Sequence, residues 1–293
     1  PEVEYGDSIH GDLSRRDFTV NSMALELTGE KPEFIDPFNG LQDLAAKVLR
    51  TPVRPGDSFN DDPLRMMRAA RFASQLDFEI APEVLNSMKD LAHRISIISA
   101  ERVRDEFTKI MMSPNPRIGI TILVDTGLAD IVLPEIPKLR LEVDEHHHHK
   151  DVYEHSITVL EQAIEHEARL GGPSLVIRLA ALLHDIGKPK TRAFIEGGGV
   201  SFHHHEVVGA RLAKKRLQAL RFDNDTIDAV ELLTMLHLRF HGYGEGEWTD
   251  SAVRRYVRDA GEFITHLHVL TRADCTTRNK AKAARLSATY DSL

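Results

Sequence analysis

The chain has 293 residues, enough for two or three domains, and its 42% hydrophobic and 28% charged residues are ordinary for a globular protein in water. The net charge of −8 excludes a uniformly basic nucleic-acid binder, although local clusters of arginine and lysine can still bind RNA. One cysteine, Cys275, excludes an internal disulfide, and because neither a signal peptide nor an apolar run of about 18 residues is present we expect a cytoplasmic protein without a membrane segment.

The sequence begins without a methionine, in a strand-like run, and we interpret it as a fragment or as a chain whose first segment is missing. Residues 18–27 are rich in β-formers, and residues 34–40 predict a short strand that leads into a turn. A short helix over residues 41–46 and a last strand over residues 47–50 are expected next. Residues 1–52 are therefore predicted to be the end of an α/β domain.

The middle of the chain is predicted to be all-helical. Residues 53–60 are rich in Pro, Gly and Asp and predict a linker. From Pro63 to about Arg140, apolar residues recur at helical spacing and are interrupted at prolines. Ser99 is an expected N-cap, and Gly127 is an expected helix end. The four predicted helices contain residues 64–72, 84–92, 103–111 and 118–123.

Residues 141–293 are predicted to be helical again. Leu179 to Pro189 forms an apolar helix that stops at His184 and Asp185, because a glycine and a proline follow at once. A glycine turn between two short strands is expected within residues 193–201. Further candidate ligands lie before and after this helix: His155, His205, His237 and Asp274.

The pair at the end of the apolar helix points to a metal. A carboxylate beside an imidazole is costly to bury unless a metal or hydrogen bonds compensate it. The order His155, His184-Asp185, Asp274 resembles the HD superfamily of metal-dependent phosphohydrolases. The resemblance implies that these four side chains bind one divalent metal, and their mixed nitrogen and oxygen donors suit Mn, Co or Ni. The alternative is a helix end whose His184 and Asp185 only hydrogen-bond each other and a turn.

Three other residues are candidates for the catalytic work of this HD domain. Lys188 is close enough in sequence to contact a phosphate, and His205 and His237 are expected to line the substrate side. Each of these two histidines could equally be a hydrogen-bonded core or surface residue. Cleavage of a phosphate ester is the expected reaction, because a divalent metal activates water and polarises a phosphoryl group, and a cyclic phosphate or a damaged RNA end is the substrate we expect.

Four motifs in the first half carry a second resemblance. Arg15-Arg-Asp-Phe-Thr-Val-Asn-Ser-Met-Ala24 and Asp61-Asp-Pro-Leu-Arg-Met-Met-Arg-Ala-Ala-Arg-Phe72 resemble two signature motifs of class II tRNA nucleotidyltransferases and bacterial poly(A) polymerases. Ile35 to Leu44 is similar to the flexible connecting motif of that family, and Glu101 to Lys109 to its neck helix. Many bacterial members carry an HD domain after the neck and body, so the resemblance covers essentially the whole chain.

The second motif suits recognition of a base. Asp62 and Arg65 are three residues apart and share one helix face, where a carboxylate accepts and a guanidinium donates. Cytosine and adenine present the complementary edge, whereas guanine and uracil would leave buried polar groups unpaired. The resemblance implies a template of Asp61, Asp62 and Arg65, with Arg68 nearby. In the alternative interpretation, Asp62 is an N-cap and Pro63 the first helical residue.

The resemblance also implies that the triphosphate and ribose are bound by Arg15, Arg16, Asp17 and Asn21, for which the alternative is an edge strand with surface arginines. Nucleotidyl transfer requires paired carboxylates that hold Mg²⁺, which the family supplies as Gly-Ser followed by Asp-x-Asp. That pattern is absent, and Asp223-Asn-Asp225 lies in a predicted helical region. We expect these carboxylates to precede Pro1.

The prediction is therefore a mainly α protein: a C-terminal remnant of an α/β nucleotidyltransferase head over residues 1–52, a helical neck and body over residues 53–140, and an all-helical HD domain over residues 141–293. The expected function is an RNA 3′-end nucleotidyltransferase that uses CTP and ATP on the tRNA 3′ end or another RNA. The alternatives are an HD phosphohydrolase with a non-polymerising, nucleotide- or RNA-binding front half, and a non-catalytic RNA-binding remnant. The oligomeric state is left open.

Overall fold

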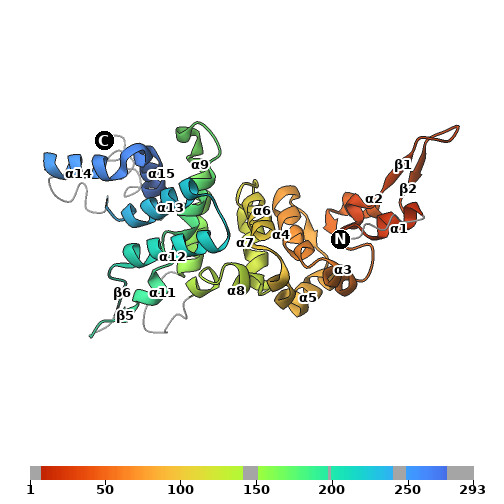
Figure 1. Cartoon of the computed structure of the whole chain (residues 1–293), viewed down its shortest axis with the longest axis horizontal. Coiled ribbons are helices and arrows are strands. Elements are labelled where there is room, and N and C mark those ends of the chain that lie inside the picture. The colour runs from red at the N-terminus through yellow and green to blue at the C-terminus, as the bar shows by residue number, and fades with distance from the viewer. Residues whose placement is uncertain (1–7, 141–150, 197–198, 240–248, 276–293) are drawn as a thin grey trace. The chain divides into compact units, whose positions relative to one another are not determined.

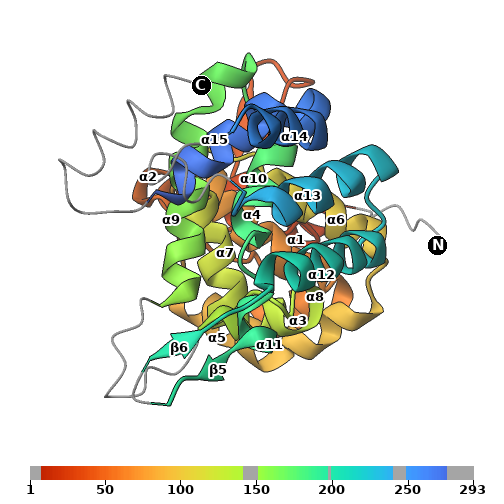
Figure 2. The same cartoon turned by 90° about the vertical axis from the view of Figure 1, so that its left-hand side faces the viewer.

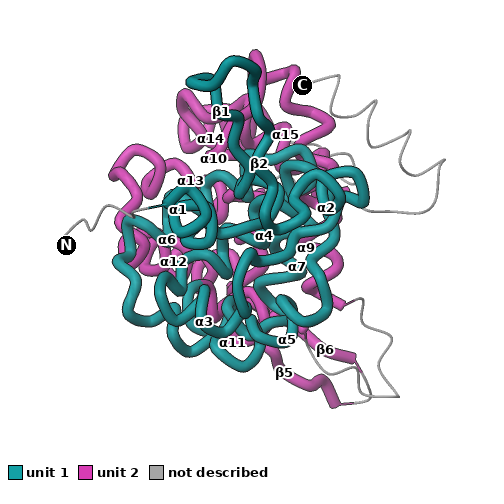
Figure 3. Tube along the Cα trace, turned by 90° about the vertical axis from the view of Figure 1, so that its right-hand side faces the viewer, with its two compact units in different colours: residues 1–132 teal, residues 133–293 magenta. Residues whose placement is uncertain are grey.

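The structure, a computed structural model, describes residues 8–140, 151–196, 199–239 and 249–275, which belong to two compact units, residues 1–132 and 133–293 (Figure 3). Helices dominate both units and the strands are short, which confirms the predicted mainly α fold. None of the described helices combines the length and the apolarity that crossing a lipid bilayer requires. The division into units falls at Val132, whereas the domain boundary predicted near Arg140 adjoins residues outside the described ranges.

The first unit starts with short elements around a small hairpin (Figure 1). The predicted strand over residues 18–27 is only partly correct, because Thr19 to Asn21 form a 3-10 turn in which the Asn21 side chain accepts a hydrogen bond from the Phe18 amide. The elements are α1 (Ile9–Ser14), η1 (Thr19–Asn21), β1 (Ala24–Glu26), β2 (Glu33–Ile35), α2 (Gly40–Ala46) and β3 (Val48–Leu49). β1 pairs with β2 in antiparallel fashion, and β3 pairs in parallel with β4 (Glu79–Ile80).

The linker predicted over residues 53–60 is wrong, because most of this segment is the helix α3 (Pro55–Asp61). Pro55 occupies the first turn, where its missing amide hydrogen costs nothing. Phe59 is fully buried and Ser58 is buried beside it, so tertiary packing stabilises a helix that local composition does not favour.

The four helices predicted for the middle of the chain are confirmed. They are α4 (Leu64–Leu76), α5 (Pro82–Leu91), α6 (Ala100–Met111) and α7 (Pro116–Asp125), and α8 (Leu128–Val132) follows Gly127, which has a positive φ of 81°. Ser99 caps α6 by accepting from the Arg102 amide. α4 packs against α6 and α7, and at Gly119 the approach is so close that a Cβ would lie 2.4 Å from Ser74 Oγ. As a result, the neck motif on α6 lies next to the second signature motif on α4.

The second unit is built around α10 (Leu175–Leu183), whose residues from Ile177 to Leu183 are all buried. α10 packs against α9, α13 and α15, and α12 packs along α13 (Figure 2). The two short strands predicted near Ala193 and Ser201 are confirmed and pair in antiparallel fashion, while Gly197 and Gly198 of the predicted turn lie outside the described residues. The remaining elements are η3 (Pro137–Leu139), α9 (Val152–Glu165), η4 (Glu167–Leu170), α11 (Lys188–Thr191), β5 (Ala193–Phe194), β6 (Val200–Ser201), α12 (His205–Ala219), α13 (Asn224–Leu236), α14 (Asp250–Ala260), η5 (Gly261–Phe263) and α15 (Ile264–Asp274).

Asp223, the first residue of the Asp223-Asn-Asp225 spacing, caps α13. Its Oδ1 accepts from the Thr226 amide at 2.8 Å, and its Oδ2 accepts from the Thr226 hydroxyl at 2.8 Å. Both carboxylate oxygens are therefore used by the helix terminus. Asp223 is therefore a helix cap, in agreement with the prediction that this pair does not serve nucleotidyl transfer.

Candidate metal centre and nucleotide site

The four predicted metal ligands meet in the second unit, because α9, the C-terminal end of α10 and the last turn of α15 converge there. His155 Nε2 lies 2.9 Å from Asp274 Oδ1 and 3.6 Å from Asp185 Oδ2. His184 Nε2 lies 3.3 Å from Asp185 Oδ2 and 3.6 Å from Asp274 Oδ1. His184 and Asp185 are essentially inaccessible to solvent. Residues separated by 119 positions along the chain thus form one cluster of nitrogen and oxygen donors.

The three predicted catalytic residues contact the same carboxylate. His205 Nε2 lies 3.2 Å from Asp185 Oδ1, and His237 Nε2 lies 3.9 Å from that oxygen. Lys188 donates to Asp185 Oδ2 at 2.6 Å. His205 begins α12 and His237 follows α13, so both are brought in by elements packed beside α10. Asp185 is therefore the centre of the whole cluster.

Backbone hydrogen bonds fix the rings of three of these histidines. The Nδ1 atoms of His184, His205 and His237 contact the carbonyl oxygens three residues earlier, at 2.8, 2.7 and 2.7 Å. Because a carbonyl oxygen only accepts, each Nδ1 carries the proton and each Nε2 is directed at Asp185. These three Nε2 atoms and Asp185 Oδ1 are buried without a hydrogen-bond partner among the described residues. Buried imidazole nitrogens that face a carboxylate and have no other partner fit a divalent cation.

The charges inside the cluster are strongly coupled. Burial alone would lower the pKa of His184, but the charge of Asp185 outweighs it and raises that pKa to about 10. Burial and the positive charge of His184 lower the pKa of His237 to about 3, so its imidazole is neutral. Burial would raise the pKa of Asp185 and of Asp274, but the neighbouring histidines hold both well below the usual range. The site therefore keeps both carboxylates ionised, as a metal requires.

Three of the predicted nucleotide-binding residues meet in the first unit: Asp17, Asn21 and Arg68. Asp17 is buried and contacts the other two. Its Oδ2 accepts from Arg68 Nε at 2.6 Å, and its Oδ1 accepts from Asn21 Nδ2 at 2.7 Å. Arg15 and Arg16 follow α1 and are exposed, and Arg16 pairs with Asp12 at 3.4 Å. Asp17 therefore connects the first signature motif to α4, which carries the second.

The predicted template residues do not pair with one another. Asp62 accepts from the Leu64 amide at 3.1 Å and from Arg102 Nη2 at 2.8 Å, so it contacts the first turn of α4, whose N-cap position is Pro63. Arg65 donates to Ser58 Oγ at 2.9 Å and also to the Arg15 carbonyl oxygen. Asp61, at the end of α3, is exposed. The sequence did not identify Ser58 as a hydrogen-bond partner of Arg65, because residues 53–60 were predicted to be a linker.

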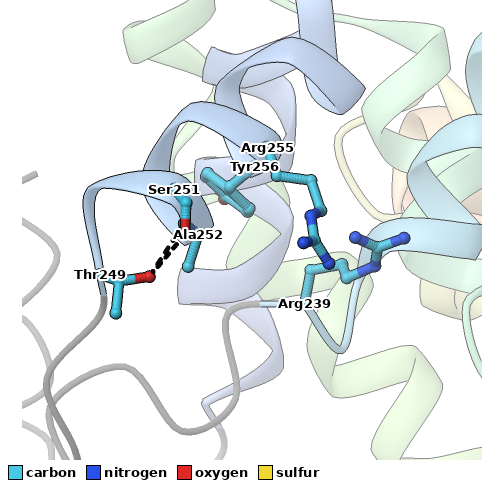
Figure 4. A pocket seen from close by; sticks show the side chains of 6 residues that line it. All are labelled: Arg239, Thr249, Ser251, Ala252, Arg255 and Tyr256. Carbon is cyan, nitrogen blue, oxygen red and sulfur yellow. Dashed lines mark hydrogen bonds between the residues drawn. The ribbon is translucent and has the colours of Figure 1, made fainter.

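A separate pocket lies beside α14, and no residue predicted as functional lines it. Its volume is about 310 Å³, and its lining comprises Arg239, Thr249, Ser251, Ala252, Arg255 and Tyr256. The guanidinium groups of Arg239 and Arg255 point toward one another across it (Figure 4). Arg239 also pairs with Asp259 at 3.2 Å. A lining of guanidinium and hydroxyl groups suits an anion rather than a metal.

Comparisons with known proteins show what these features are similar to. Three family models match in chain order: "Poly A polymerase head domain" over residues 1–50, "Probable RNA and SrmB-binding site of polymerase A" over residues 77–139, and "HD domain" over residues 152–279. The A-adding tRNA nucleotidyltransferase of Deinococcus radiodurans is 35% identical over 273 residues, which are 91% of this chain and 60% of that protein. The multifunctional CCA protein of Neisseria meningitidis serogroup A is 37% identical over 243 residues, 81% of this chain and 55% of that protein.

The fold agrees with this assignment. The Bacillus stearothermophilus CCA-adding enzyme in complex with CTP superposes with a TM-score of 0.64 at 24% identity, covering 99% of this chain and 61% of that chain. The three family models divide the chain, in order, into segments similar to a polymerase head, to an RNA-binding site and to an HD domain. The chain resembles the class II tRNA nucleotidyltransferases and poly(A) polymerases that carry an HD domain, as the sequence motifs predicted. It spans between 55% and 60% of the length of the two curated relatives described.

Proposed function

We propose that the protein is an RNA 3′-end nucleotidyltransferase that adds C, A or both to tRNA or another RNA, and that its HD domain hydrolyses a phosphate ester. The similarity to A-adding and multifunctional CCA proteins along the head, the RNA-binding region and the HD domain supports the first activity. The buried cluster with its orphan imidazole nitrogens is the observation that carries the second. The division into residues 1–52, 53–140 and 141–293 remains part of this proposal.

In the head, the side chains have distinct tasks under this proposal. Arg15 and Arg16 are exposed cations that would contact the triphosphate of CTP or ATP. Asp17 holds Arg68 and Asn21 in place and thereby orients the nucleotide-binding face of α4. Asp62 and Arg65 would read the base, which requires them to leave their present partners, Arg102 and Ser58. The magnesium ions for transfer are bound by residues other than these.

A primer-extension assay tests the nucleotidyltransferase proposal. The full-length protein is incubated with Mg²⁺, tRNA lacking its 3′-terminal CCA, and each nucleotide separately. We expect incorporation of CTP, ATP or both, and we expect Arg65→Ala to relax this selectivity. Equal use of GTP or UTP by the unsubstituted protein would contradict the base-template assignment.

The same assay distinguishes the nucleotidyltransferase proposal from a second candidate function. Asp62 and Arg65 contact protein groups rather than each other, which favours a front half that binds nucleotide or RNA without polymerising it. If the full-length protein adds no nucleotide but hydrolyses phosphate esters, the HD domain is the enzyme and this second function replaces the first.

In the HD domain, His155, His184, Asp185 and Asp274 would hold a divalent transition metal such as Mn, Co or Ni. When bound, such an ion supplies Lewis-acid polarisation of a phosphoryl group and acidifies water. Backbone carbonyls hold the His184 ring so that its Nε2 faces the carboxylates. Lys188, whose ammonium group touches Asp185, is positioned to contact a phosphate oxygen of a cyclic phosphate or an RNA end.

Elemental analysis tests the HD proposal directly. Protein purified without added metal is compared with Asp185→Ala, which removes the carboxylate at the centre of the cluster. We expect bound metal and hydrolysis of a 2′,3′-cyclic nucleotide only in the unsubstituted protein. Nucleotide addition should survive the substitution, because it depends on a different metal site. Equal metal content in both proteins would show that the cluster is only structural.

A further inference from the structure

The helix α14 has one buried face and one exposed, strongly basic face. Tyr256 and Ala260 are buried, and the Tyr256 ring stacks on the His268 ring of α15 with the centroids 5.8 Å apart. The exposed face carries three arginines: Arg254, Arg255 and Arg258. Packing on α15 therefore holds the helix in place, while its guanidinium groups are directed to the solvent.

A fourth arginine joins this face from the end of α13. Arg239 is exposed, follows the last residue of α13 by three positions, and points its guanidinium group toward that of Arg255 across the pocket of about 310 Å³ (Figure 4). Hydroxyl groups of Thr249 and Ser251 line the same pocket. Two guanidinium groups that face each other repel unless an anion lies between them. The four arginines are called the arginine surface below.

Acidic groups of the protein neutralise only part of this charge. Two aspartates pair with three of the arginines at N–O distances of 3.2 to 3.5 Å: Asp250 with Arg254, and Asp259 with Arg239 and Arg258. Arg255 makes no ion pair or hydrogen bond with the residues that the structure describes. Arg254 and Arg258 are four positions apart, a spacing at which like charges destabilise a helix. Helix stability therefore does not account for this concentration of positive charge, whereas an anionic ligand does.

We propose that the arginine surface binds the sugar–phosphate backbone of an RNA strand. A guanidinium group donates two parallel hydrogen bonds to phosphate oxygens, and four such groups on two neighbouring elements suit successive phosphates of a polyanion. This inference rests on the proposed function for the choice of RNA, and it adds a contact outside both the head and the region similar to an RNA-binding site, residues 77–139. Arg239 lies two positions after His237, so the surface and the buried cluster share one end of α13. A strand bound here can direct its end toward that cluster.

The salt dependence of RNA binding tests the inference without an activity assay. Fluorescently labelled tRNA lacking its 3′-terminal CCA is titrated with the chain at a series of KCl concentrations, and the slope of log Kd against log [KCl] is determined. Each lost phosphate contact should reduce that slope by about 0.7–0.9, which corresponds to about five- to eightfold weaker binding at about 0.1 M KCl. We expect this loss in Arg255→Gln and in Arg258→Gln. Arg255→Lys should keep the slope, because it keeps the charge.

The matched control is Arg211→Gln, which removes the same charge from an exposed position on α12, outside the arginine surface. It should leave the slope unchanged. Thermal unfolding is measured on every variant and should not change, because the substituted side chains are exposed, so a loss of RNA binding reports a lost contact. ATP is titrated in parallel, and its binding should be the same in all these proteins.

Three outcomes overturn the inference. Tight RNA binding whose slope is the same in Arg255→Gln and Arg258→Gln would remove the arginine surface and leave RNA as the partner in the proposed function. No RNA binding by the unsubstituted chain would remove both. An equal loss in Arg211→Gln would mean that RNA responds to the total charge of the second unit, and a loss confined to ATP would make a free nucleotide the ligand of this surface.

Discussion

Asp17 is a buried carboxylate whose two oxygens are both occupied, by Arg68 and Asn21. Removing Arg68 leaves a buried charge short of a donor, so Arg68→Ala should lower the free energy of unfolding by about 2–3 kcal/mol. Arg16→Ala is the matched control and should change it by less than about 0.5 kcal/mol, because Arg16 is exposed. Urea unfolding of the three proteins measures both values. Equal stability of all three would mean that Asp17 does not depend on Arg68.

Lys188 holds a positive charge 2.6 Å from Asp185 Oδ2, an oxygen that a metal would use. A cation beside a ligand opposes metal binding, so Lys188→Met should tighten Mn²⁺ binding by about tenfold. If Lys188 also contacts the substrate phosphate, hydrolysis at saturating metal should fall in the same variant. Lys190→Met, at an exposed position on α11, should change neither quantity. Weaker metal binding in Lys188→Met would show that the ammonium group supports the ligands instead.

At the scale of single residues, residue types and spacing predicted which side chains lie close together. They did not predict the hydrogen-bond partner of each side chain. The order His155, His184-Asp185, Asp274 correctly anticipated one cluster. Placing His205 and His237 on the substrate side did not anticipate their direct approach to Asp185, because ring orientation depends on the Phe202 and Thr234 carbonyls. Spacing also could not separate a template role of Asp62 from a cap, since both need the same position before a helix.

At the scale of elements, Gly187 is the point where the turn after α10 meets the start of α12. A Cβ there would lie 2.1 Å from the His205 carbonyl oxygen and 2.7 Å from the Gly209 amide nitrogen. These are backbone atoms, so neither can rotate away. Gly187→Ala should therefore destabilise the protein by about 3 kcal/mol and move His205 away from Asp185.

The control for this substitution is Gly56→Ala in α3, where the nearest atom to a new Cβ is Ser87 Oγ at 3.8 Å. It should be neutral or slightly stabilising. Thermal unfolding and Mn²⁺ binding are measured on both variants. Gly187→Ala with unchanged stability and unchanged metal content would mean that α12 does not depend on this close approach.

Elements were predictable where periodicity and caps agree, as in α4 to α7 and α10. They were not predictable where a local signal conflicts with long-range packing. Residues 55–61 have linker composition, yet Phe59 is buried and the segment is helical. Residues 19–21 have strand-forming side chains, but the Thr19 amide donates to the Arg50 carbonyl oxygen and its hydroxyl to Asp43, partners that no local pattern reveals.

At the scale of the whole molecule, the residues assigned to the two proposed activities belong to different compact units. Every candidate nucleotide-binding residue, from Arg15 to Arg68, lies within residues 1–132, and every candidate metal ligand lies within residues 133–293. The predicted metal ligands come from α9, α15 and the residues that follow α10, so the cluster exists only when those elements are folded together. Binding of a metal should therefore stabilise the second unit and leave the first unchanged.

Hydrogen exchange measures this difference. A ligand that binds only the folded state at about one hundred times its dissociation constant adds about 2.7 kcal/mol, which corresponds to a rise of about 5–10 °C in the unfolding temperature of a unit of this size. With Mn²⁺, amides of α9, α10 and α15 should gain protection, whereas those of α4 and α6 should not. A chelator should reverse the gain, and Asp185→Ala should show none. Equal protection of both units would mean that they unfold as one cooperative body, and protection confined to α4 and α6 would place the metal elsewhere.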